Sequence, residues 1–409
     1  MSHGFSLERL QRIRLVLQGF VDRGEIAGVV TLTHRHGVEA DFCAVGLQDR
    51  ARNRPMQRDT IFRLASMTKP IVAAALLTLV EENAIGLYDP IDRWLPELSH
   101  RKMMRDPNGS LDDLIPSPRA ITLHDILTYR MGIGWGPSTL RGRLFGLMAP
   151  PLAPAQNIKS EPLSPDAWMA KLGSYPLPYA PGGTWLYHTA GDVAGVLLAR
   201  VTGKSLEDAL HERIFEPLGM HDASFSVPKE KRARLAVVYA NDDEKKATRM
   251  IDDAEETTWG EPPLFPSGAG GLVGTVDDFQ RFGRMLLQGG KLDDVRVLSR
   301  KSVEAMTTDY LTAEQHATPF GSFDRFDLDE GQMWTHRGFG YGLSVRTHRI
   351  GLGPSVGAFT WPGAFGTSWL ADPSEELMTT FLIQKVSPNP FLTRAGDDFI
   401  QTVYQAIDD

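Results

Sequence analysis

The sequence predicts an α/β fold of the α+β type, in which both ends of the chain build one antiparallel sheet and a helical region is inserted between them. Two β-rich stretches lie near the start, at residues 29–34 and 38–45. Three more lie near the end, at residues 341–347, 367–371 and 377–384. Helices and loops occupy the middle of the chain. Because short turns join neighbouring strands, we expect the strands to pair antiparallel.

The amino-terminal elements follow from local spacing. Residues 6–22 place apolar side chains near helical spacing, and Gly24 can end that helix. The two early strands are separated by His36-Gly37, a dipeptide that predicts a hairpin turn. Residues 66–86 are rich in Ala and Leu and predict a strong helix.

The later elements are predicted in the same way. Helices are expected over residues 190–201 and 205–214, near 276–287, and at the end over 394–406. Residues 229–256 are charged and weakly patterned, and we expect them to form a surface excursion.

Length and element order suggest how the chain is divided into domains. A chain of 409 residues is long enough for one large domain or for two to three small ones. The element order predicts a discontinuous α/β domain, residues 1–90 and 255–409, and a mainly helical inserted domain, residues 91–254.

Composition excludes several classes of protein. With 43 Lys and Arg against 51 Asp and Glu, the net charge of −8 argues against a nucleic-acid partner. Cys43 is the only cysteine, which leaves no intrachain disulfide and no Cys-based zinc site. The longest apolar run, residues 71–80, is too short to span a bilayer. The first residues lack the pattern of a signal peptide, so we expect a cytoplasmic protein without a membrane partner.

A nucleophile candidate stands at the start of the Ala/Leu-rich helix. Ser66 and Lys69 form an S-x-x-K tetrad, and residues three apart on a helix share one face. An amine beside the serine hydroxyl can take its proton and so activate it. Pro70 follows directly and is expected to bias Lys69 away from helical geometry. On its own, the tetrad is also compatible with a Ser N-cap followed by a solvated Lys.

The surrounding residues carry a family resemblance. Residues 62–70, FRLASMTKP, resemble the nucleophile segment of class C serine β-lactamases and of their relatives, the family VIII carboxylesterases. Penicillin-binding proteins and D-aminopeptidases share the tetrad. Residues 125–132 resemble the family stretch LLTHTSG with both polar positions changed. The resemblance, closest to the family VIII carboxylesterases, implies the serine β-lactamase/transpeptidase-like fold.

A second family element surrounds Tyr187. The family places Y-x-N or Y-x-x on a loop that enters a helix, and its tyrosine is usually taken as a general base whose pKa a nearby lysine lowers. In this chain Tyr187 is followed by His188 and Thr189, where β-lactamases have Asn at the third position. A threonine cannot contact a β-lactam amide as Asn does. His188 either lines the pocket or points outward.

The third element precedes the last strands. β-Lactamases have K-T-G there, whereas this chain has Trp361-Pro362-Gly363, similar to the W-x-G of family VIII esterases. An indole in place of the lysine removes a carboxylate contact and offers an apolar wall. By resemblance, Gly363 allows close backbone approach, and the N–H of Ala364 joins that of Ser66 in an oxyanion hole. Trp135 is either another wall of the site or a cover of the core.

Other motifs point away from catalysis. Ser355 lies in a G-x-S-x-G match, but a nucleophile elbow needs a strand before it and a helix after it. A strand-like segment follows instead, so we expect a loop serine. His34 and His36 have no third ligand nearby in sequence, and we expect no metal site.

The predicted function is hydrolysis of carboxylic esters, as in a short-chain esterase. By resemblance, Ser66 carries the acyl group and Tyr187 and Lys69 move protons, with no cofactor or metal. An acyltransferase, a β-lactamase and a D-peptide or amide hydrolase remain alternatives on the same site. A non-catalytic binding or sensor domain is an alternative of another class. The expected partner is a small-molecule ester, and the oligomeric state is unknown.

Overall fold

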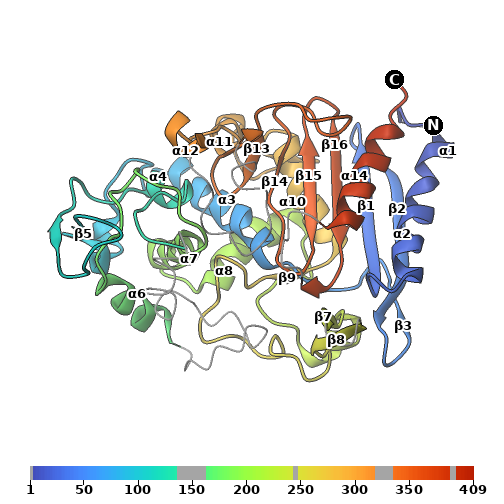
Figure 1. Ribbon diagram of the computed structural model, residues 1–409, viewed down its shortest axis with the longest axis horizontal. Coiled ribbons are helices and arrows are strands. Elements are labelled where there is room, and N and C mark those ends of the chain that lie inside the picture. Colours follow the sequence, from blue (N-terminus) through green and yellow to red (C-terminus); the bar gives the residue numbers. More distant parts are fainter. Residues whose placement is uncertain (1–2, 136–162, 243–246, 318–334, 387–392) are drawn as a thin grey trace.

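The main sheet joins the two ends of the chain, as the sequence predicts (Figure 1). The computed structural model describes residues 3–135, 163–242, 247–317, 335–386 and 393–409. All neighbouring strands of the eight-stranded sheet pair antiparallel. The strands follow one another in the order β12 (Arg337–Phe339), β13 (Ser344–Arg346), β14 (Phe359–Thr360), β15 (Ser368–Asp372), β16 (Leu377–Leu382), β1 (Gly28–Arg35), β2 (Val38–Asp49) and β3 (Arg54–Pro55).

The hairpin between β1 and β2 has the predicted turn. His36 and Gly37 both have positive φ, 52° and 79°, which a two-residue type I′ loop requires. Arg35 pairs with Val38 across this turn. Both strands are longer than the apolar pattern suggested, because pairing extends into residues with polar side chains.

Helices cover both faces of the sheet (Figure 1). Val29 packs in an apolar cluster with Phe20 and Phe399, whereas its neighbour Val30 belongs to the larger core on the other face. Successive strand residues point to opposite faces, so both faces are buried. The first face is covered by α1 (Leu7–Leu10), α2 (Arg12–Asp22) and α14 (Arg394–Gln405), and the second by α10 (Val276–Leu287).

The predicted Ala/Leu-rich helix is α3 (Thr68–Glu81), which is shorter than the predicted span and almost entirely buried. A 3₁₀ turn, η1 (Ala65–Met67), precedes it. Pro70 lies in the first turn of α3, where backbone N–H groups have no intrahelical acceptor, and Lys69 keeps helical geometry. The expectation that Pro70 displaces Lys69 from the helix is therefore wrong.

The predicted helices near residues 190–201 and 205–214 are α7 (Thr189–Thr202) and α8 (Leu206–Leu210). A π-helical turn, η5 (His211–Phe215), continues α8. The remaining elements connect these helices and strands: η2 (Ile91–Arg93), η3 (Pro96–Leu98), β5 (Lys102–Met104), β6 (Leu114–Pro116), α4 (Leu123–Leu127), α6 (Pro165–Gly173), α9 (Glu216–Leu218), β10 (Lys291–Leu292), β11 (Val295–Arg296), α11 (Arg300–Met306) and α12 (Ala313–Ala317).

Residues 229–242 and 247–256, the described part of the charged segment, do not form the surface excursion that their charge suggested. A 3₁₀ helix, η6 (Lys229–Arg234), leads into β7 (Val238–Asp242) and β8 (Ala247–Asp252), which form a three-stranded sheet with β17 (Lys385–Val386). Val238 is buried in a cluster with Ile61 and Ala65. The segment thus packs beside the chain that leads to Ser66, and several of its charged side chains form ion pairs, among them Arg234 with Asp222 and Asp252 with Arg63.

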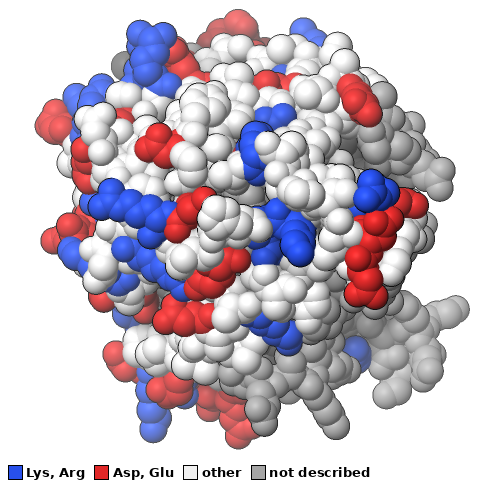
Figure 2. All heavy atoms as spheres, turned by 90° about the vertical axis from the view of Figure 1, so that its left-hand side faces the viewer, with Lys and Arg blue, Asp and Glu red and all other residues white. Residues whose placement is uncertain are grey.

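Two further observations concern the surface. Among the described residues, no helix is long and apolar enough to cross a membrane. On the face shown in Figure 2, acidic and basic side chains are interspersed and do not gather into one basic patch. The division into domains at residues 91 and 254 and the cytoplasmic location stay predictions.

Candidate active site

A tight turn presents Ser66 at the start of α3. The strand before it, β4 (Phe62–Arg63), pairs with β9 (Val273–Gly274). Thr68 connects the two segments, because its hydroxyl donates to the Ala65 carbonyl at 2.7 Å and accepts from the Leu272 N–H at 3.2 Å. Ala65 has a φ of 47°, a conformation that costs a non-glycine residue about 1–3 kcal/mol. The backbone strain of this turn therefore lies at Ala65, directly before the candidate nucleophile.

The structure brings Ser66, Lys69 and Tyr187 into direct contact. The Lys69 ammonium donates to Ser66 Oγ at 2.9 Å, and the Tyr187 hydroxyl donates to the same oxygen at 2.8 Å. Lys69 Nζ also donates to the Ala269 carbonyl and lies 4.7 Å from the centre of the Tyr187 ring. The serine oxygen thus has two proton-carrying neighbours, one on each side.

Burial changes the acidity of both neighbours of Ser66. Desolvation lowers the pKa of Lys69, which is only 2% exposed, although the Asp192 carboxylate opposes this shift. Burial raises the pKa of Tyr187 to about 12, although its hydrogen bonds with Ser66 and with Trp361 oppose this shift. The expected lowering of the Tyr187 pKa by lysine is therefore wrong. Lys69, once neutral, is therefore a better proton acceptor than Tyr187, whose hydroxyl keeps its proton near neutral pH.

Trp361 supports Tyr187 and is not an exposed wall. It follows β14 directly, is fully buried, and its indole N–H donates to the Tyr187 hydroxyl at 3.1 Å. Its own carbonyl accepts from the Trp369 indole N–H at 3.0 Å, which fixes its position on the sheet. The interpretation of Trp361 as a substrate-facing wall is corrected accordingly: the neighbouring rings cover it, and it acts through Tyr187.

We expect Trp361→Phe to lower kcat by about tenfold with little change in KM. Phenylalanine keeps the aromatic packing but removes the N–H donor, and one hydrogen bond to the reacting group is worth about 1–1.5 kcal/mol. Steady-state kinetics on a p-nitrophenyl ester measure the change, with Trp168→Phe as a control, because Trp168 is also a buried indole but its ring packs against Phe265. An increase in KM at unchanged kcat would instead show that the indole binds substrate.

The residues around Tyr187 are packed against one another. Trp135 is partly exposed, and its backbone pairs with that of Tyr187 in both directions at 2.8 and 2.9 Å. His188 points inward, since its ring stacks on Trp135 with centroids 4.1 Å apart. Thr189 is fully buried at the start of α7, so it offers no surface to a substrate. The assignment of Thr189 to substrate binding is therefore corrected, because the helix turns this side chain into the core.

The chain after Trp361 approaches the nucleophile turn closely. A Cβ on Gly363 would lie 2.3 Å from the Leu64 carbonyl oxygen, so only glycine fits. The Gly363 N–H donates to the Thr367 carbonyl at 2.7 Å, which forms a tight turn. Ala364 is exposed at the tip of this turn. These positions are compatible with the predicted oxyanion role of the Ala364 and Ser66 N–H groups, which stays a prediction.

Sequence reasoning missed three residues behind Lys69. Asp192, in the first turn of α7, accepts from the Ser267 hydroxyl at 2.6 Å and from the Ala269 N–H at 3.1 Å. Its carboxylate is buried, and desolvation raises its pKa. A signal was present, because an Asp five residues after Tyr187 opens an otherwise apolar helix. Ser267 and Ala269 carried no such signal.

The other motifs lie away from this cluster. Ser355 is in a loop whose backbone N–H donates to Asp372, and no helix follows it before β14. His34 contacts Gln280, and His36 lies near Glu376. Within the part of the chain that the structure describes, no group of three or more His, Cys, Asp or Glu could hold a metal ion.

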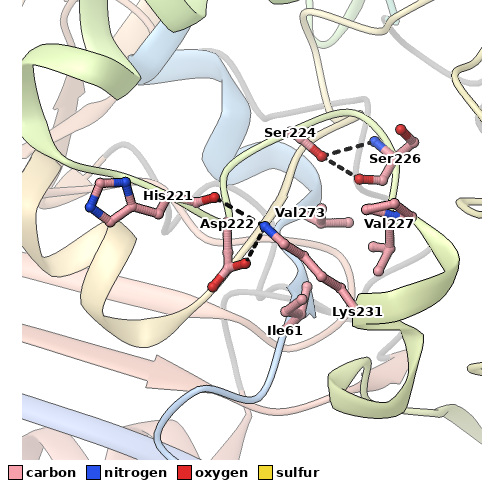
Figure 3. A pocket seen from close by; sticks show the side chains of 9 residues that line it. Ile61, His221, Asp222, Ser224, Ser226, Val227, Lys231 and Val273 are labelled. Carbon is pink, nitrogen blue, oxygen red and sulfur yellow. Dashed lines mark hydrogen bonds and ion pairs between the residues drawn. The ribbon is translucent and has the colours of Figure 1, made fainter.

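A small cavity of about 30 Å³ lies apart from Ser66, between η6 and β9 (Figure 3). Lys231 Nζ is directed at the Asp222 carboxylate, 2.8 Å away, and at the His221 carbonyl, 3.3 Å away. Since the charged lining groups already contact one another, and the volume is that of a water molecule or two, this cavity is not a substrate site.

The fold matches the architecture that the resemblance implied. The family model described as Beta-lactamase matches residues 13–399, and the chain belongs to this family. Protein Rv1367c of Mycobacterium tuberculosis is 37% identical over 405 residues and covers 94% of this chain and 96% of its own length. Esterase EstB of Burkholderia gladioli is 31% identical over 377 residues, with 88% and 86% covered. Among solved structures, "EstCE1, a hydrolase with promiscuous acyltransferase activity" shares the fold, with a TM-score of 0.76, 23% identity, and coverage of 98% of this chain and 99% of that chain.

Proposed function

We propose that the protein is a serine hydrolase that cleaves carboxylic esters through an acyl-Ser66 intermediate. One observation carries the proposal: Ser66 Oγ is the shared hydrogen-bond partner of Lys69 Nζ and the Tyr187 hydroxyl. A serine needs an adjacent base to become a nucleophile, and burial lowers the pKa of the nearest amine. Family membership and the name of esterase EstB support the same class of enzyme.

The contacts of Lys69 and Tyr187 with Ser66 support a different role for each of them in proton transfer. Neutral Lys69 takes the proton from Ser66 Oγ as the oxygen attacks the ester carbonyl. Tyr187, hydrogen-bonded to the same oxygen, passes its proton to the leaving alcohol and regains one from the Lys69 ammonium, so that the Ser66 proton leaves with the alcohol. In deacylation the same two groups take a proton from the attacking water and return one to Ser66 Oγ. The backbone N–H groups of Ser66 and Ala364 bind the developing oxyanion. Every step uses this chain's own residues.

A neutral ester fits the site better than a β-lactam. Trp361 stands where β-lactamases have the lysine of K-T-G, and Thr189 stands where they have Asn. Trp361 is buried beneath Tyr187, so an indole occupies the place of the carboxylate-binding cation. A substrate carboxylate without its cation in a partly dry site is costly, whereas a neutral ester carries no such penalty.

Acyl transfer to an alcohol is the second candidate. An acyl-enzyme can react with any hydroxyl that reaches it, and the structural relative EstCE1 is a hydrolase with promiscuous acyltransferase activity. Amide or D-peptide hydrolysis would use the same residues on another leaving group. A non-catalytic domain would not need a buried amine beside a serine hydroxyl.

We expect short-chain p-nitrophenyl esters to be turned over far faster than nitrocefin, by a factor of about 10³ or more in kcat/KM. The reason is the missing carboxylate contact at Trp361. A panel of p-nitrophenyl esters of increasing acyl length, assayed alongside nitrocefin, measures the ratio. Nitrocefin cleavage as fast as that of p-nitrophenyl butyrate would overturn the ester assignment, and the absence of both an ester burst and a fluorophosphonate label would favour a binding domain.

A further inference from the structure

Within the described residues, the buried Asp192 carboxylate has hydrogen-bond partners for only one of its two oxygens. It is 1% exposed, and Oδ1 accepts two hydrogen bonds, from Ser267 and from the Ala269 N–H. Its second oxygen, Oδ2, has no hydrogen-bond partner among the described residues. A ring nitrogen of His188, also buried and also without a hydrogen-bond partner in the described part of the chain, lies 3.5 Å from it. Burying a carboxylate oxygen without a hydrogen-bond donor lowers the stability of the fold, so a functional reason for it is expected.

Asp192 and Lys69 both form hydrogen bonds with the backbone of the same residue, Ala269. The Ala269 N–H donates to Asp192, and the Ala269 carbonyl accepts from Lys69. Helix α7 can come this close because a Cβ on Gly191 would lie only 3.0 Å from the Ala269 Cα. The carboxylate therefore holds the backbone that in turn orients the amine toward Ser66.

Other titratable groups facing Lys69 are neutral near pH 7. Burial raises the pKa of Tyr187 and of Tyr129, and burial together with Lys69 lowers the pKa of His188. Tyr187 and His188 come from the loop before α7, and Tyr129 follows α4. Among the described residues, the charge that acts on Lys69 is that of Asp192. A single negative charge in a dry cluster acts strongly on a nearby amine.

We propose that Asp192 is a positioning residue of this site: its carboxylate holds the Ala269 peptide against Lys69, and its charge determines over which pH range the Lys69 amine is free of its proton. The inference rests on the proposed function, since it assigns Asp192 a part in setting the proton acceptor of Ser66. It extends that function to a residue outside the S-x-x-K and tyrosine motifs.

The sign of the effect follows from charge. Lys69 can accept a proton only when neutral, so activity rises with pH through the pKa of Lys69. Asp192 stabilises the ammonium form and raises that pKa. Removing its charge must therefore move the acidic limb of the pH profile of kcat/KM to lower pH. An opposite charge close to a titratable group typically shifts its pKa by about one unit or more.

Asp192→Asn tests the proposal on the full-length enzyme. The amide oxygen can still accept from Ser267 and Ala269, so geometry is kept while the charge is removed. We expect the acidic limb with p-nitrophenyl butyrate to move down by about one pH unit or more. Asp278→Asn is the matched control, because Asp278 is also a buried carboxylate but caps α10 and is not among the groups acting on Lys69. For Asp278→Asn, the acidic limb of the pH profile of kcat/KM is expected to stay at the wild-type position.

A second variant keeps the test decisive if Asp192→Asn does not fold. Ser267→Ala removes the hydroxyl that donates to Asp192 Oδ1 and leaves the backbone contact from Ala269 to Asp192 in place. We expect a smaller shift in the same direction, because a less stabilised carboxylate binds a proton more readily. Unchanged acidic limbs in every variant that folds would overturn the proposal.

The wild-type enzyme separates this proposal from the proposed function. If the wild type hydrolyses esters and loses activity on Ser66→Ala, the function holds, and the pH profiles alone decide the role of Asp192. If the wild type forms no acyl-enzyme, the proposed function fails and the role assigned to Asp192 fails with it.

Discussion

Ser66→Ala is expected to lower esterase activity by a factor of about 10⁴ or more. The hydroxyl of Ser66 is the shared partner of the candidate base and the candidate proton shuttle, and alanine leaves neither with an oxygen to act on. Initial rates with p-nitrophenyl butyrate measure the loss. Mass spectrometry after a fluorophosphonate should show one covalent label per chain in the wild type and none in the variant.

Ser355→Ala is the matched control for this substitution. It changes a serine in the G-x-S-x-G match, whose loop is held by a backbone contact to Asp372 and not by the serine hydroxyl. We expect activity near wild type and an unchanged thermal unfolding midpoint. If Ser355→Ala were the inactive variant and Ser66→Ala retained activity, the assignment of the nucleophile would be wrong.

Lys69→Ala and Tyr187→Phe are each expected to lower kcat by about 10²–10⁴ with a modest change in KM. Both residues contact Ser66 Oγ and act on its proton, not on substrate binding. Because they serve one step, the double variant should lose far less than the product of the two single losses. Single-turnover kinetics of all three variants measure the coupling.

Stability must be followed in the same series, since Lys69→Ala leaves space in the core. Tyr404→Phe is a suitable control for the tyrosine, because Tyr404 donates to Asp372 on the far side of the sheet. It should leave kcat unchanged. Multiplicative losses in the Lys69 and Tyr187 double variant would show that the two residues act independently.

Local patterns predicted much of this molecule. The helix at α10, the positive-φ turn of the β1–β2 hairpin and the presence of strands near both chain ends follow from residues close in sequence. The contact between Ser66 and Lys69 was predictable for the same reason, since residues three positions apart on a helix lie on the same face. Tyr187 was predictable only through the family resemblance, because 121 residues separate it from Ser66.

Packing determined the remaining features of the site. Burial depth is a property of the assembled core, and it reversed the expected direction for the Tyr187 pKa and lowered that of Lys69. It also covered Trp361, which acts on Tyr187 through its N–H instead of facing a substrate. The contact from Asp192 to Ala269 joins residues 77 apart in sequence, and no local period marks such a pair. Spacing along the chain predicts which residues share a face, whereas desolvation and long-range hydrogen bonds arise only when separate faces are packed together.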